Sequence, residues 1–155
     1  MKILVMSDSH GREEYVYSIL YDNRDADMII HLGDGEQDLD YALREVNFQV
    51  TTRIIKVKGN CDFCVDLPIT SFENIEGYKF YITHGYVQNV KMGLDHIYMD
   101  AKKSGRNVVL FGHTHRQVYE NRDGIHLFNP GAVKNGYYGI INIKDGEISF
   151  EKNSF

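Results

Sequence analysis

Apolar strand-like segments and helical segments alternate along the N-terminal part of the chain, and this alternation restricts the fold more than any other feature of the sequence. Strands are predicted at 2–6, 28–30 and 54–57, because each is a short apolar run that ends at polar or glycine residues. The two intervening segments carry apolar residues at i, i+3 and i+4 spacing, which is typical of helices that bury one face. This order of elements predicts a right-handed, parallel β-α-β-α-β half.

A polar side chain follows each of these three strands at a constant interval. Asp8 precedes Asp34 by 26 residues, and Asp34 precedes Asn60 by 26 residues. No residue-level repeat accompanies the interval, so we attribute it to one β-α unit per interval. Because the carboxyl ends of parallel strands meet at one edge of a sheet, we expect the three side chains to lie where open α/β sheets bind ligands.

The alternation continues with strands predicted at 78–83 and 108–111 and a helix predicted at 90–101. The first of these strands ends at His84, and the second leads into His113-Thr114-His115. Two imidazoles one residue apart on an extended backbone point the same way, so we expect both to reach a single site. Neutral imidazole is a common metal ligand, and this histidine pair therefore indicates a metal site.

Beyond the histidine pair the helical period disappears. Asp123-Gly124 and Asp145-Gly146 predict hairpin turns between short alternating runs, and Asn129-Pro130-Gly131 predicts another tight turn. We expect the C-terminal quarter of the chain to be an antiparallel meander that forms or completes a second sheet. No linker rich in proline and serine interrupts the sequence, so residues 1–155 are predicted to form a single domain.

Charge and composition exclude some classes of protein. The formal net charge of -5 argues against a broad basic surface for nucleic acid or anionic membrane. The apolar run at 3–6 is too short for the core of a signal peptide, and no window approaches the length of a membrane span. Together with the use of only two cysteines, these features predict a cytoplasmic protein that does not bind membranes.

The polar side chains that follow predicted strands share one property, since each offers an oxygen or an imidazole nitrogen. They are Asp8, His10, Asp34, Asn60, His84, His113 and His115. Seven mixed donors are too many for one tetrahedral zinc ion, and they suit two ions that share a carboxylate. Two close metal ions serve in-line displacement at phosphorus, in which metal-bound hydroxide attacks and both ions neutralise charge on the phosphoryl oxygens.

The same residues resemble the ordered motifs of the calcineurin-like metallophosphoesterases. Five blocks carry the resemblance: Asp8-Ser9-His10, Gly33-Asp34, Gly59-Asn60-Cys61-Asp62, His84-Gly85 and Gly112-His113-Thr114-His115. The chain length and Asn129-Pro130-Gly131 resemble the small, single-domain prokaryotic phosphodiesterases of this superfamily. The resemblance implies an α/β fold in which helices flank a two-sheet β-sandwich, in four α/β/β/α layers.

The resemblance also implies a role for each of the seven donors. The implied ligands of the first metal ion are Asp8, His10 and His115, and those of the second are Asn60, His84 and His113, with Asp34 as the bridge. The implied enzyme is a metal-dependent phosphodiesterase that acts on a small phosphate ester. We expect manganese as the metal, with nickel, iron, cobalt and zinc as alternatives, because nitrogen and oxygen donors accept them all. The prokaryotic relatives suggest a homo-oligomer.

One position departs from the family pattern. Many members carry a histidine after the asparagine, where it assists the leaving group and the next carboxylate orients it, whereas this chain has Cys61 followed by Asp62. A thiol is a poor substitute for an imidazole as an acid near neutral pH. The predicted catalytic residues are therefore Asp34, Asn60, His84, Cys61 and Asp62, and we expect Cys61 to assist the leaving group poorly.

Other interpretations compete with this one. Cys61 and Cys64 form a C-x-x-C pair, which is typical of redox proteins, but the adjacent Asn60 favours the metal centre. Residues 33–38 miss the dinucleotide fingerprint G-x-G-x-x-G, because Asp38 replaces the third glycine. Phosphomonoesterase activity is an alternative within the enzyme class, and the retromer subunit with this fold represents a non-catalytic protein-interaction scaffold. All seven donors are present, which favours an enzyme over a scaffold.

Overall fold

The computed structural model describes residues 1–46 and 52–155 of the chain. Its elements, in chain order, are β1 (Lys2–Met6), α1 (Glu13–Asp22), β2 (Met28–His31), α2 (Glu36–Glu45), β3 (Arg53–Lys56), β4 (Thr70–Ile75), β5 (Tyr78–Thr83), α3 (Asp95–Lys103), β6 (Val108–Leu110), β7 (Gln117–Arg122), β8 (Ile125–Pro130), the 3-10 helix η1 (Val133–Asn135), β9 (Tyr137–Lys144) and β10 (Glu147–Ser154). None of the helices among the described residues is long and apolar enough to cross a membrane.

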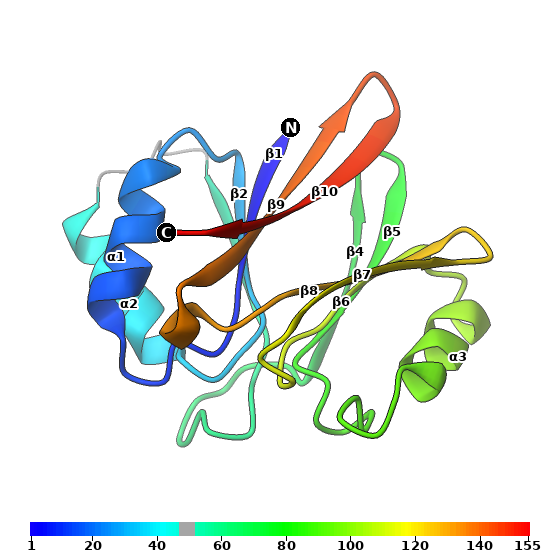
Figure 1. Ribbon diagram of the computed structural model, residues 1–155, viewed down its shortest axis with the longest axis horizontal. Coiled ribbons are helices and arrows are strands. Elements are labelled where there is room, and N and C mark those ends of the chain that lie inside the picture. The colour runs from blue at the N-terminus through cyan, green and yellow to red at the C-terminus, as the bar shows by residue number, and fades with distance from the viewer. Residues whose placement is uncertain (47–51) are drawn as a thin grey trace.

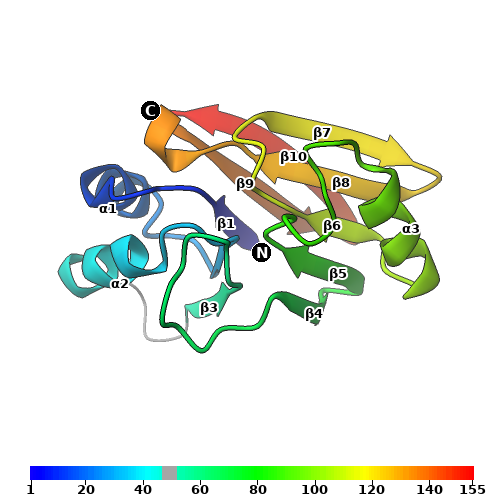
Figure 2. The same cartoon turned by 90° about the horizontal axis from the view of Figure 1, so that it is seen from below.

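The described strands form two five-stranded sheets that pack against each other, in the orders β10-β9-β1-β2-β3 and β4-β5-β6-β8-β7. Helices α1 and α2 cover the outer face of the first sheet, and α3 covers the outer face of the second (Figure 1). The view from below shows the same succession of layers (Figure 2). The predicted four-layer α/β/β/α sandwich is therefore confirmed.

Alternation along β1 explains how one short strand serves two hydrophobic layers. Ile3 and Val5 belong to the core between the two sheets, whereas Leu4 and Met6 pack under α1 and α2. Successive side chains of a strand point to opposite faces, so a strand that is buried on both faces is apolar at every position. Full burial of each such side chain contributes about 1.5–3 kcal/mol, which fixes the register of this central strand.

The parallel half has the predicted arrangement. β1 pairs in parallel with β2, and β2 pairs in parallel with β3. The carboxyl ends of these three strands therefore lie at one edge of the first sheet, and each interval of 26 residues spans one β-α unit. In the second sheet, β5 and β6 are also parallel neighbours. The segments that follow their carboxyl ends meet the edge of the first sheet, where His84 Nε2 lies 3.3 Å from Asp34 and His115 Nε2 lies 3.0 Å from Asp8.

The prediction of one C-terminal meander is wrong in part. The hairpin β7–β8 belongs to the second sheet, where β8 pairs in parallel with β6. The hairpin β9–β10 returns to the first sheet, where β9 pairs antiparallel with β1. Gly136, with φ of 83°, ends η1 in the left-handed conformation between the two hairpins. The four C-terminal strands are thus divided between the two sheets and tie them together.

The third helix begins later than its apolar spacing predicts. α3 starts at Asp95, and residues 86–92 before it form turns. Asn89 and Gly93 have φ values of 53° and 143°, which an α-helix does not contain. Val90 is nevertheless buried in the same cluster as Ile97 of α3. Apolar spacing predicted the buried face correctly here, but not the backbone conformation that presents it.

Candidate metal centre

The predicted donors lie in the segments that follow the carboxyl ends of five strands. Asp8 and His10 follow β1, Asp34 follows β2, and Asn60 follows β3. In the second sheet, His84 directly follows β5, while His113 and His115 lie between β6 and β7. The hydrogen bond from the amide of Gly112 to the carbonyl of His84, 2.9 Å long, links the two segments of the second sheet.

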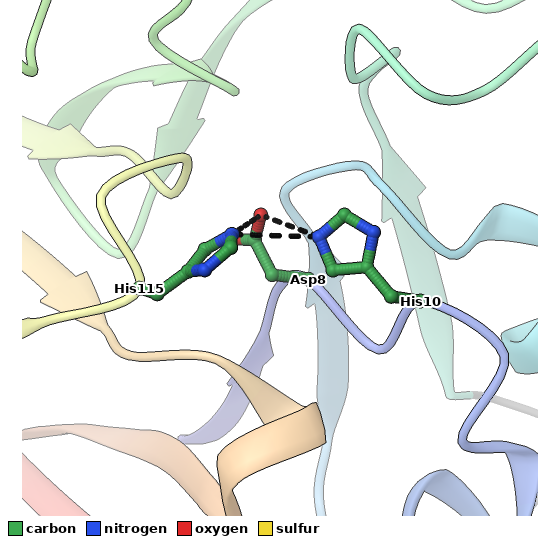
Figure 3. Close-up of side chains that lie close together, drawn as sticks. All are labelled: Asp8, His10 and His115. Atoms are coloured by element: carbon green, nitrogen blue, oxygen red, sulfur yellow. Dashed lines mark hydrogen bonds and ion pairs between the residues drawn. The ribbon is translucent and has the colours of Figure 1, made fainter.

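Asp8, His10 and His115 form a cluster, here called the outer cluster, whose donor atoms all lie within 4.8 Å of one another. The Nε2 atom of His115 is 3.0 Å from Asp8 Oδ1, and the Nε2 atom of His10 is 3.5 Å from the same oxygen. The two Nε2 atoms lie 3.4 Å apart (Figure 3). Three donors from two sheets thus point at one small volume.

Asp34, His84 and His113 form the inner cluster, which meets the same 4.8 Å limit. His84 Nε2 lies 3.3 Å from Asp34 Oδ2 and 3.2 Å from His113 Nδ1. The other ring nitrogen of His84 lies 2.7 Å from the carbonyl oxygen of Leu32, where it donates a hydrogen bond. This contact fixes the ring so that Nε2 faces the cluster, the arrangement by which a backbone carbonyl orients a metal-ligating histidine.

The two clusters adjoin through their carboxylates. Asp34 Oδ2 is 3.8 Å from His10 Nε2 of the outer cluster, and Asp8 Oδ1 is 3.9 Å from His84 Nε2 of the inner cluster. Asp34 also forms a third donor group with His10 and Cys61. Each carboxylate therefore faces a histidine of the other cluster, which is the geometry expected of a ligand shared between two ions.

The donor set fits divalent cations on its own chemistry. Asp8 Oδ1 is buried and accepts no hydrogen bond from any described residue, although a histidine nitrogen lies 3.0 Å away. Pairs of imidazole nitrogens face each other in both clusters. A buried oxygen without a donor is costly, and a cation beside it would satisfy this oxygen together with the facing imidazole nitrogens.

Five of the six cluster residues have a backbone conformation that is unusual for side chains other than glycine. The residues with positive φ are Asp8 (58°), His10 (47°), Asp34 (58°), His113 (64°) and His115 (60°). The left-handed conformation costs about 1–2 kcal/mol per residue, and such strain concentrates at functional sites. The expectation of an extended backbone at His113 and His115 is therefore wrong, and the kinked backbone directs the two rings into different clusters.

Close approach of the backbone at two glycines brings the segments together. A Cβ atom at Gly59 would overlap the carboxylate of Asp34, and one at Gly112 would overlap the hydroxyl of Ser7. Ser7 in turn donates a 2.5 Å hydrogen bond to Asp8 Oδ2, which also accepts the backbone N–H of His113 at 3.1 Å. Glycine at these two positions thus allows both carboxylates to sit against the neighbouring segment.

Asp62 acts on the backbone of the inner cluster. Its Oδ2 accepts the N–H groups of Asp34 and Gly59, both at 2.8 Å, and its Oδ1 accepts those of Gly35 and Glu36 at 2.9 Å and 3.2 Å. Burial raises the pKa of Asp62, but these four hydrogen bonds lower it below its ordinary value. A carboxylate has about four acceptor sites, so no site remains to orient an imidazole at position 61.

The remaining two predicted catalytic residues lie at the exposed rim. Asn60 donates from Nδ2 to the Cys61 sulfur at 3.3 Å, and no hydrogen bond joins its amide to His84 or His113 in the described part of the chain. The backbone N–H of Cys61 donates to Asp34 Oδ1 at 2.7 Å. Burial and the charge of Asp34 raise the pKa of the Cys61 thiol. Both Cys61 and Cys64 are free, exposed thiols.

Asp34 and His84 of the inner cluster shift each other's pKa. Burial raises the pKa of Asp34, but the hydrogen bond and the charge of His84 outweigh it and hold that pKa well below its ordinary value. Burial lowers the pKa of His84, but the neighbouring Asp34 and Asp8 raise it above the ordinary value. These opposite shifts reflect one interaction, in which a buried carboxylate and a buried imidazole stabilise each other's charge.

Two lysines act on the histidines of the loop between β6 and β7. Burial, the charge of His84 and the charge of Lys91 all lower the pKa of His113. Burial and the charge of Lys134 lower the pKa of His115, against the opposing effect of Asp8. Positive charge therefore lies on the flank of the site formed by this loop.

Several further residues support the donors through contacts that the sequence did not reveal. Asn129, completely buried, donates to the carbonyl of Gly112 at 2.8 Å and to Thr114 Oγ1 at 3.1 Å, which holds the loop between the two histidines. Asp38 accepts the hydroxyl of Ser9 at 2.5 Å and the N–H of Gly11 at 2.8 Å. The proximity of Ser7 and Ser9 to Asp8 in the sequence was the available signal: Ser7 bonds its neighbour Asp8, whereas the partner of Ser9, Asp38, lies 29 residues away.

Comparison with known proteins agrees with this architecture. The family model described as the calcineurin-like phosphoesterase superfamily domain matches residues 1–145. The chain is 33% identical over 135 residues to the probable metallophosphoesterase YsnB of Bacillus subtilis, covering 86% of this chain and 76% of that protein. It is 30% identical over 153 residues to the phosphodiesterase YfcE of Escherichia coli K12, covering 86% and 79% of the two chains.

Solved structures give the same result. A predicted phosphoesterase from Streptococcus pneumoniae TIGR4 superposes with a TM-score of 0.81 at 25% identity, covering 99% of this chain and 88% of that chain. Vps29 of Entamoeba histolytica, in a structure with zinc, superposes with a TM-score of 0.77 at 19% identity, covering 99% of each chain. At that identity, the likeness to Vps29 shows the shared fold alone.

Proposed function

We propose that this chain, which belongs to the calcineurin-like phosphoesterase superfamily, is a phosphodiesterase that depends on two divalent metal ions. The observation that carries the proposal is the pair of adjoining donor clusters, in which Asp34 Oδ2 lies within 3.8 Å of a histidine in each cluster. The similarity to a relative named phosphodiesterase supports a diester substrate.

The proposal assigns the seven donors to two ions. The residues of the outer cluster would hold the first ion, and those of the inner cluster would hold the second. Asn60 would complete the second set, and Asp34 would serve both. Bound divalent ions would supply Lewis acidity, which activates water as a nucleophile and neutralises charge on the phosphoryl oxygens. Asn60 would join the inner cluster by turning its amide away from Cys61.

The protein contributes by holding its donors in place before substrate arrives. The carbonyl of Leu32 keeps His84 Nε2 directed into the inner cluster. The N–H of Cys61 occupies Asp34 Oδ1 and leaves Oδ2 facing the histidines. Donors that need no reorganisation during the reaction stabilise the transition state more than mobile ones.

Leaving-group protonation is the step for which the chain is poorly equipped at position 61. The raised pKa of Cys61 makes this thiol an even weaker acid than a free cysteine. We therefore propose that the enzyme favours diesters with good leaving groups, such as nitrophenolate, because these depart without a proton.

The two alternatives to a phosphodiesterase are a non-catalytic scaffold and a phosphomonoesterase. A scaffold on the same fold has no need for five strained donor residues that converge on buried, unsatisfied oxygen, so the backbone at the site favours an enzyme. A phosphomonoesterase would use the same donors, and only the choice of substrate separates it from a diesterase. The expected manganese, the cytoplasmic location, the homo-oligomer and the single domain over residues 1–155 stay predictions.

A hydrolysis screen of chromogenic monoesters and diesters across divalent metals tests the proposal. Protein stripped by a chelator, with its metal content measured, should be inactive toward bis(4-nitrophenyl) phosphate, and manganese should restore turnover. Full activity after verified removal of metal would refute the two-metal proposal. Faster hydrolysis of 4-nitrophenyl phosphate than of the diester would favour the phosphomonoesterase.

A further inference from the structure

A hollow of about 400 Å³ adjoins the loop that carries His113 and His115. Thr114, which separates the two histidines, forms part of its wall. Phe111, Val90 and Val118 supply an apolar lining. The hollow thus shares a wall with the candidate metal centre and lies within the size range of pockets that bind small molecules.

Two cations line the hollow, and a third lies near the site. Lys91 and Arg116 line the hollow itself, and Lys134, whose backbone N–H donates to the carbonyl of Asp8 at 3.2 Å, lies beside the outer cluster. Among the described residues, no salt bridge joins any of these three side chains to a carboxylate. A chain with a net charge of -5 therefore keeps unpaired positive charge beside this site.

The other hollow that borders the site has the opposite character. It is lined by His10 and Asp34 of the donor clusters and by the further carboxylates Glu36, Asp38 and Asp62, with no lysine or arginine among the described lining residues. An anionic group would meet carboxylates there, whereas on the histidine-loop side it would meet free cations. The two hollows thus differ in charge, and an anionic ester group of a phosphodiester would be bound more favourably in the one lined by Lys91 and Arg116.

We propose that the hollow between Lys91 and Arg116 binds the arm of the substrate that carries a second phosphate on a ring-bearing body, as in a nucleotide. The inference rests on the proposed phosphodiesterase function. The apolar lining of Phe111, Val90 and Val118 suits the ring, and the fork of Arg116 suits a phosphate. The substrate class is then a nucleotide-like diester with a further anionic group, rather than a neutral diester.

Two substrates that differ by one phosphate measure how much the proposed contact between that phosphate and the hollow contributes. Thymidine 5′-(4-nitrophenyl phosphate) and its 3′-phosphorylated form have the same leaving group. In both, water attacks phosphorus, the bond to nitrophenolate breaks, and the nucleotide leaves with the 5′-phosphate. With manganese-loaded protein, kcat/KM should be about fivefold or more higher for the 3′-phosphorylated form, mainly through KM.

Variants assign that preference to the hollow. Arg116→Gln and Lys91→Gln should each reduce the ratio of the two kcat/KM values, and the double variant should bring the ratio close to one. Lys144→Gln is the matched control, because Lys144 is an exposed lysine at the β9–β10 turn, at the end of the first sheet away from the site (Figure 1). The control should keep the wild-type ratio.

The outcomes separate this inference from the proposed function. A wild-type ratio near one, or a ratio unchanged in the double variant, would overturn the inference while leaving the phosphodiesterase intact. If neither substrate is hydrolysed, the proposed function fails, and binding still decides the inference. Calorimetry should then show tighter binding of thymidine 3′,5′-bisphosphate than of thymidine 5′-phosphate, with the difference lost in the double variant. Equal affinities would overturn it.

Discussion

The outer and inner clusters differ in how firmly the fold holds them. The histidine side chains of the outer cluster, His10 and His115, are 26% and 29% exposed. In the inner cluster, His84 is completely buried and Asp34 is 2% exposed. A backbone carbonyl fixes the His84 ring, whereas His10 Nε2 faces only side chains of the site. The difference lies in the histidines, since Asp8 of the outer cluster is as buried as His84 of the inner one.

This difference predicts that the two ions behave differently. A buried, preorganised site loses little side-chain entropy on binding and shields its charges from water. We therefore expect the inner ion to be the more tightly held of the two, and the outer ion to exchange. Substitutions in each cluster test this comparison.

Asp34→Asn should remove the carboxylate ligand that the two metal ions are proposed to share. The substitution keeps the shape but removes the charge that faces histidines of both clusters. We expect kcat to fall by about a thousandfold, against about tenfold for His10→Asn, because only the first change affects both ions. Stopped assays at saturating manganese measure both values. Near-normal turnover of Asp34→Asn would show that Asp34 does not bridge.

His84→Asn and His10→Asn compare the clusters by metal affinity rather than rate. Loss of His84 removes a ring that Leu32 orients, and we expect manganese affinity at the inner site to fall by about 100-fold. Loss of His10 should weaken the outer site by about tenfold. Metal titration followed by calorimetry, with two binding steps resolved, supplies both numbers. Equal losses would contradict the difference in preorganisation.

Asp62→Ala and Asp38→Ala compare two carboxylates that hold backbone near the clusters: Asp62 holds the segments after β2 and β3, and Asp38 holds the segment after β1. Asp62 accepts four backbone N–H groups around the inner cluster, so its loss should lower the free energy of unfolding by about 2–4 kcal/mol. Asp38 accepts two hydrogen bonds beside the outer cluster, and its loss should cost about 1 kcal/mol. Urea unfolding at neutral pH measures both. A smaller cost for Asp62 than for Asp38 would contradict this ranking.

The pH dependence of the Asp62 effect follows from its lowered pKa. The folded protein holds this carboxylate ionised, so its stabilising contribution is complete above the unfolded pKa of 3.8 and is lost as the pH falls through the folded value. The difference in unfolding free energy between wild type and Asp62→Ala should therefore be constant near neutrality and shrink in acid below that value. A difference that grew as the pH fell would contradict the assignment.

Cys61→His should have the smallest effect on catalysis of these substitutions. An imidazole at this position could donate a proton to the leaving group, which helps alkyl leaving groups more than nitrophenolate. Because the oxygens of Asp62 are occupied by backbone donors, the ring would lack an orienting partner, and we expect only a modest flattening of the dependence of kcat/KM on leaving-group pKa. A series of aryl and alkyl diesters at saturating metal measures the slope. Parallel slopes would show that position 61 does not assist departure.

The residue types in the turns explain which hairpins could be predicted from the sequence and which could not. Asp123-Gly124 and Asp145-Gly146 identified two hairpins, since aspartate and glycine accept the positive φ values found there. The turn between β4 and β5 has the same conformation at Glu76-Gly77, with φ values of 47° and 86°. Glutamate is not a typical residue for that conformation, so the hairpin and β4 escaped prediction.

The sequence by itself determined the parallel half and the order of the donors along it. Short apolar runs, one-faced helices and the polar residues that follow them are local patterns, and parallel pairing then brings Asp8, Asp34 and Asn60 to one edge. Local patterns did not decide which donors meet: the family resemblance implied the division of His113 and His115 between two ions, and only the tertiary structure showed the backbone kinks that direct the two rings into different clusters. Only the pairing of β5 with β6 brought the segments that carry Lys91 and Arg116 to the lining of one hollow. Contacts between distant segments depend on how whole layers fit together, and that information is spread over the entire core.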